Sequence, residues 1–83
     1  MRYNIIFSTV DYRLERHPVS QRLNLSENEA RDVVIGHAGY NYDEVTRIFA
    51  ALQATRYMSI RPKGYLQEQE NRLQLDLYIH QEE

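Results

Sequence analysis

Histidine, acidic residues and cysteine make most metal sites and acid–base pairs, so these side chains are the first to examine for chemistry. The chain has three histidines, His17, His37 and His80, and no cysteine. No two histidines are three or four residues apart, the spacing that would place both on one face of a helix. The adjacent acids Asp43 and Glu44 would fall on different helix faces. The sequence therefore predicts no metal site and no cofactor.

Nucleophilic catalysis and phosphate binding leave local patterns that this chain lacks. It has no G-x-S-x-G element, and its glycines fit neither G-x-x-x-x-G-K nor G-x-G-x-x-G. The segment Gly36-His37-Ala38-Gly39-Tyr40 is the most unusual, and a loop contacting a ligand is one interpretation of it. We favour a helix stop, because glycine ends helices by adopting a positive φ. A chain of 83 residues also has little room for a deep pocket. We therefore predict that the protein is not an enzyme.

Arginine and tyrosine are the enriched residue types. All ten basic residues except Lys63 are arginine, and the chain has seven tyrosines. Arginine presents a planar fork to carboxylate or phosphate, and tyrosine adds contact area with few rotatable bonds. Both dominate the energetics of protein interfaces. The simpler alternative is a codon bias toward arginine combined with the strand propensity of tyrosine.

The first part of the chain has the period-2 pattern of a β-hairpin. Residues 2–12 alternate in two phases that switch near Ser8 and Thr9, which predicts a strand with a bulge. The polar segment 13–18 ends in proline and predicts a turn. Residues 19–25 then predict the second strand.

Two helices are expected next, each opened by a capping box. Ser26 with Glu29, and Asn41 with Glu44, have the spacing in which the two residues cap each other's backbone N–H groups. The apolar stripes that follow have helical spacing. They consist of Ala30, Val33, Val34 and His37 in the first helix, and Val45, Ile48, Phe49 and Leu52 in the second.

The last part of the chain returns to period 2. Residues 57–61 predict a strand, residues 65–69 a short irregular one, and residues 72–80 the clearest strand of all. In that last strand Leu73, Leu75, Leu77 and Ile79 line one face, whereas Arg72, Gln74, Asp76, Tyr78 and His80 line the other. Such alternation is typical of a sheet with one face on the core and one facing water.

The element order is therefore β-β-α-α-β-β, which predicts one α+β domain over residues 1–83. Its antiparallel sheet should carry both helices on one face. No apolar run approaches the ~20 residues of a membrane span. The first residues also lack a signal-peptide pattern, so we expect no membrane association and a cytoplasmic location.

The uncovered face of this sheet is the expected binding surface. By alternation it should carry the candidate binding residues Arg22, Tyr57, Arg61, Arg72 and Tyr78. The alternative is an ordinary solvated sheet face.

Three functions remain open. The leading one is a protein-binding module, such as a small regulator or inhibitor, acting on a protein partner through this face; a free sheet edge could also form a homodimer. The second is nucleic-acid binding, in which tyrosines stack bases and arginines contact phosphates. The net charge of −2 disfavours it. The third is a small enzyme whose carboxylates pair only in space.

Overall fold

The six expected elements occur in the predicted order in the computed structural model, which describes residues 1–63 and 73–80. They are β1 (Arg2–Val10), β2 (Arg16–Leu25), α1 (Glu27–Ala38), α2 (Tyr42–Thr55), β3 (Tyr57–Ile60) and β4 (Leu73–His80). The expected strand at 65–69 lies outside the described residues. Among the helices of the described part, none has the length and apolar character to cross a membrane.

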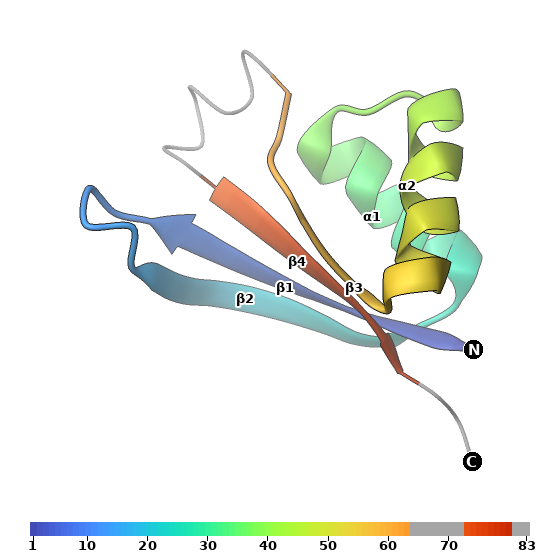
Figure 1. Ribbon diagram of the computed structural model, residues 1–83, viewed down its shortest axis with the longest axis horizontal. Coiled ribbons are helices and arrows are strands. Elements are labelled where there is room, and N and C mark those ends of the chain that lie inside the picture. The colour runs from blue at the N-terminus through green and yellow to red at the C-terminus, as the bar shows by residue number, and fades with distance from the viewer. Residues whose placement is uncertain (64–72, 81–83) are drawn as a thin grey trace.

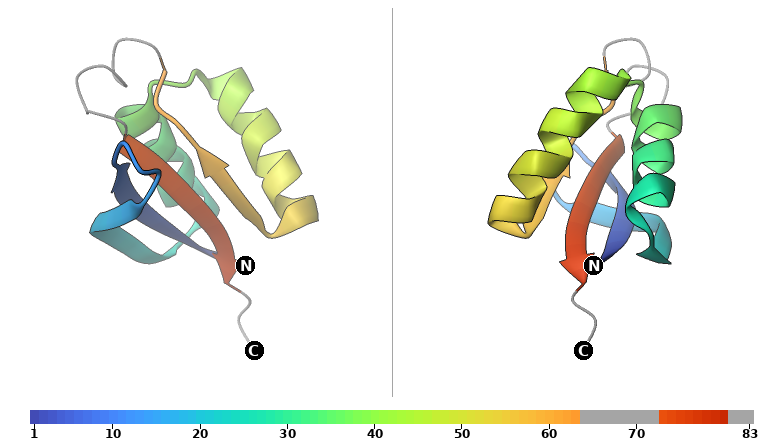
Figure 2. Two further views of the ribbon diagram at one scale, coloured as in Figure 1. Left: turned by 60° about the vertical axis from the view of Figure 1, so that its left-hand side comes forward. Right: turned by 90° about the vertical axis from the view of Figure 1, so that its right-hand side faces the viewer.

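The strands form one antiparallel sheet in the order β2-β1-β4-β3 (Figure 1). Helix α1 packs against β1 and β2, and α2 packs against β3 and β4. Figure 2 shows the arrangement from both sides, with the helices behind the sheet on the left and in front of it on the right. The predicted α+β class, with both helices on one face, is confirmed.

The core lies between the sheet and the helices. In β1 and β4 the period-2 pattern directs alternate residues toward the helices, and the register pairs Ile5 with Leu77 and Phe7 with Leu75. The largest fully buried apolar side chains are Tyr3, Ile5, Val34, Val45, Phe49, Leu52, Leu75 and Leu77. The buried Tyr3 keeps its polar end satisfied, because its hydroxyl donates to Glu27 Oε1 at 3.2 Å.

Both predicted capping boxes are present. Ser26 accepts the Glu29 N–H at 3.2 Å and Asn41 accepts the Glu44 N–H at 2.9 Å, while each glutamate bonds back to the cap N–H. Gly39, at φ 77°, ends α1, so it is the helix stop of the glycine pair. Paired caps and stops of this kind make helix boundaries readable from local sequence.

Removal of the first cap tests the start of α1. Ser26→Ala is expected to lower the free energy of unfolding by about 1 kcal/mol, because the Glu29 N–H loses its acceptor. Denaturant unfolding measures the change, and Asn28→Ala in the same helical turn is the matched control. Equal effects of the two substitutions would contradict the capping assignment.

The hairpin turn is shorter than the sequence predicted. The Asp11 N–H donates to Glu15 O at 3.0 Å and the Leu14 N–H to Asp11 O at 2.9 Å, so the chain has already turned when β2 begins at Arg16. The assignment of residues 16–18 to the turn was therefore wrong. Proline at position 18 did not end the strand, because β2 is at the sheet edge, where a missing N–H is tolerated.

Candidate functional site

The face of the sheet turned away from both helices is the candidate surface, which we call the open face (Figure 2, left). Residues paired across neighbouring strands share a side of the sheet. In β1, the residues between the buried Tyr3, Ile5 and Phe7 point away from the helices, and the cross-strand pairs of these residues extend the assignment to the other strands. They assign to the open face Asn4, Ile6 and Ser8 of β1, Gln74, Asp76 and Tyr78 of β4, Tyr57 and Ser59 of β3, and Pro18 and Gln21 of β2.

Asp76 lies at the centre of the open face and is only 4% exposed. Arg16 Nη1 donates to both carboxylate oxygens, at 2.8 and 2.9 Å, and the Tyr57 hydroxyl donates to Oδ1 at 3.1 Å. Arg16 comes from β2, so its side chain crosses β1 to reach β4. The charge of Asp76 is therefore compensated by a residue 60 positions away in the sequence.

Arg16 contacts a tyrosine as well as Asp76. Arg16 Nη1 also donates to the Tyr57 hydroxyl at 3.3 Å, and this bond, followed by the charge of Asp76, raises the pKa of Arg16. The side chain of Arg16 remains 43% exposed. Its guanidinium is therefore oriented at the surface by two partners, Asp76 and Tyr57.

Two tyrosines lie beside this ion pair. Tyr57 and Tyr78 are cross-strand partners with ring centroids 4.9 Å apart and planes inclined at 42°. Burial, followed by the charge of Asp76, raises the pKa of Tyr78, so its phenol is protonated at neutral pH. The pair forms an aromatic surface with hydroxyl groups able to bond to a ligand.

Only part of the predicted residue set comes together. Tyr57 and Tyr78 are in contact, but Arg22 pairs with Ile5 and therefore lies on the side of the sheet that faces the helices. Register shifts between Tyr3 and Ile5 and between Phe7 and Ser8 explain its position, because a bulge changes the phase of the strand.

The two other predicted arginines are not in this cluster. Arg61 is exposed just after β3, at the end opposite Tyr57, about 13 Å away along an extended chain. Its carbonyl accepts a hydrogen bond from the Tyr40 hydroxyl at 2.6 Å. Arg72 lies outside the described residues.

Arg16 and Asp76 are the members of the cluster that sequence reasoning missed. Asp76 had a usable signal, since it stood alone as an acid in the middle of an alternating strand. Arg16 had none, because it was assigned to the turn and its partner depends on the order and register of three strands. The cluster of Arg16, Tyr57, Asp76 and Tyr78, here called the tyrosine–arginine cluster, is therefore a product of the tertiary structure.

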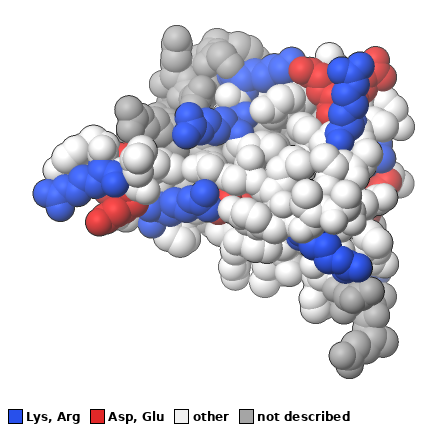
Figure 3. All heavy atoms as spheres, in the orientation of Figure 1, with Lys and Arg blue, Asp and Glu red and all other residues white. Residues whose placement is uncertain are grey.

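The distribution of basic side chains can be followed on one face of the molecule. On the face drawn in Figure 3 they occur at several separate places, some of them beside acidic groups, and they do not merge into one continuous stripe. Searches against protein families, curated proteins and solved structures found no match to the chain.

Proposed function

We propose that the protein is a non-enzymatic binding module that docks its open face on a partner protein. The observation that carries this proposal is the tyrosine–arginine cluster on the side of the sheet away from α1 and α2. A regulator or inhibitor that occupies a partner's surface would act in this way.

Pre-organisation of the cluster supports the proposal. Arg16 is oriented by Asp76 and Tyr57, and the rings of Tyr57 and Tyr78 hold each other. Side chains that are already ordered lose less conformational entropy on docking, so more of their contact energy contributes to affinity. Tyrosine and arginine in such positions are the usual centres of protein interfaces.

The compensated charge of the cluster indicates the kind of partner. Asp76 offsets the charge of Arg16, so the centre of the open face is close to neutral while remaining rich in hydrogen-bonding groups. A protein surface with apolar and polar groups is a better complement than a phosphate backbone. The rings of Tyr57 and Tyr78 would also suit nucleic-acid bases, which makes nucleic acid an outcome of the test.

Loss of the two tyrosines tests the proposal. Tyr57→Ala with Tyr78→Ala is expected to weaken capture of the partner by roughly thirtyfold or more, since a hot-spot side chain is worth about 2 kcal/mol or more. The partner is first captured from an extract of the cells that make this protein. Titration of that partner with the wild type and the variant then measures the loss of affinity. Tyr42→Ala, which removes an exposed tyrosine of α2, is the matched control.

A second variant separates binding from folding. Gln21→Arg adds bulk and charge at an exposed position of the open face and leaves the tyrosine–arginine cluster intact. It should also weaken capture while preserving the thermal midpoint. Equal capture by wild type and both open-face variants would contradict the proposal. Steeply salt-dependent binding to labelled DNA or RNA would assign the face to nucleic acid instead.

A further inference from the structure

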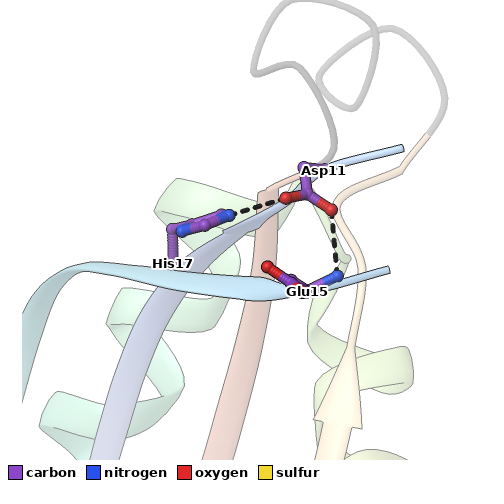
Figure 4. Close-up of side chains that lie close together, drawn as sticks. All are labelled: Asp11, Glu15 and His17. Carbon is purple, nitrogen blue, oxygen red and sulfur yellow. Dashed lines mark hydrogen bonds and ion pairs between the residues drawn. The ribbon is translucent and has the colours of Figure 1, made fainter. Parts of the chain in front are cut away.

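The tip of the β1–β2 hairpin brings together a histidine and two carboxylates (Figure 4). Asp11, Glu15 and His17 each offer a ligand atom, and these atoms all lie within 4.8 Å of one another. His17 is the cross-strand partner of Thr9, and residues two apart in a strand share a side. Asp11 and Glu15 lie in the turn that follows β1, and Figure 4 shows their side chains next to that of His17.

The donor atoms of this group are already oriented. Asp11 Oδ1 accepts the N–H groups of Arg13 and Glu15 at 2.8 and 3.0 Å, which directs Oδ2 toward His17 Nε2, 2.8 Å away. Two backbone N–H groups therefore fix the orientation of the Asp11 carboxylate beside the imidazole of His17. An ionised, fixed carboxylate is the form that binds a cation.

The backbone around the group is held by the turn. The bonds from Asp11 N to Glu15 O and from Leu14 N to Asp11 O close the loop, and Val10 pairs with Arg16 at its base. Two of the ligand residues, Asp11 and Glu15, therefore lie in a closed turn, and the third, His17, lies at the start of β2. Ligand atoms at about 2.0–2.2 Å from a tetrahedral zinc ion lie roughly 3.4 Å apart. The three ligand atoms here, all within 4.8 Å of one another, are close to that spacing.

We propose that Asp11, Glu15 and His17 bind one divalent transition-metal ion of the zinc or nickel class at the hairpin tip. The imidazole selects these ions over magnesium and calcium, which take oxygen ligands in larger numbers. Three protein ligands leave coordination positions for water or for a group from another molecule. His17 and Glu15 are exposed, so the site is an open, low-affinity one.

This inference is independent of the proposed function. Arg16, between Glu15 and His17 in the sequence, reaches Asp76 on the opposite side of the sheet. The metal site and the tyrosine–arginine cluster therefore use opposite faces of β2. An experiment can contradict the metal site without contradicting the binding function, and the reverse also holds.

Calorimetric titration of the protein with Zn²⁺ and with Ni²⁺ tests the site. We expect one ion to bind per chain and Mg²⁺ to produce no comparable heat. His17→Ala should weaken metal binding by about 10–100-fold or more, since loss of a residue that only hydrogen-bonds to a metal ligand already lowers metal affinity that much. His80→Ala removes an exposed histidine at the end of β4 and is the matched control, with unchanged affinity expected.

NMR of the wild-type protein provides a test that does not depend on a variant folding. Resonances of the His17 ring should move first as Zn²⁺ is added, before those of His37 and His80, and should return when EDTA is added. Absence of binding at millimolar Zn²⁺, equal affinity in His17→Ala, or first perturbation of another histidine would overturn the proposal.

Discussion

Phe49→Ala is expected to lower the free energy of unfolding by about 3–5 kcal/mol. Phe49 is only 1% exposed and sits where α2 meets the sheet, with the Tyr3 ring 5.3 Å away. The Arg31 guanidinium lies 5.5 Å from the centre of its ring, so the substitution also removes a cation–π contact with α1. A chain of this length has a total stability of roughly 4–12 kcal/mol, so the variant loses a large part of it.

Urea denaturation followed by circular dichroism measures this effect. Arg47→Ala, an exposed position two residues earlier in α2, is the control and should change stability by less than about 0.5 kcal/mol. Phe49→Leu should cost less than the alanine variant because it leaves a smaller cavity. A Phe49→Ala midpoint equal to that of the control would mean that this stripe of α2 does not face the core.

Leu75→Ala is expected to cost about 2–5 kcal/mol and tests which side of the sheet is covered. Leu75 is 0% exposed, and its cross-strand partners are Phe7 and Ile60, both buried on the side of the helices. Alanine at this position leaves a cavity bounded by rigid strands on both sides, which relax little. The loss should therefore lie well above that of a surface substitution.

The neighbouring residue supplies the control for the sheet. Gln74 precedes Leu75 in β4 but lies on the open face, where its amide donates to Ser59 Oγ. Gln74→Ala should cost about 1 kcal/mol or less, since a single partly exposed hydrogen bond is lost. A larger cost for Gln74→Ala than for Leu75→Ala, measured by thermal and denaturant unfolding, would reverse the assignment of the two faces.

Together these two pairs of substitutions would establish which side of the sheet faces the core and which is the open face. If Leu75 and Phe49 lie in the core, the tyrosine–arginine cluster lies on the side away from the helices. Loss of partner capture in the tyrosine variants could then be attributed to the surface. The binding measurements are best interpreted after the unfolding measurements for this reason.

The sequence by itself determined the elements whose signals are local. Ser26 and Asn41 marked the helix starts because capping joins residues three apart, and α2 showed its core stripe because a helix repeats every 3.6 residues. The alternation from Leu73 to Ile79 predicted a strand with one buried face for the same kind of reason. The α+β class followed from the order of these elements.

Only the tertiary structure decided which side chains meet across the sheet. Alternation assigns residues to faces within one strand, but it says nothing of the register between strands, and a bulge or a shift of one residue exchanges the faces. The sequence assigned Arg22 to the wrong face for that reason. The contact of Arg16 with Asp76 could not be predicted from the sequence, because it spans three strands. The grouping of Asp11 with His17 likewise depends on where the hairpin turns. The sequence placed His17 in the turn because Pro18 follows it, whereas both residues belong to the edge strand β2.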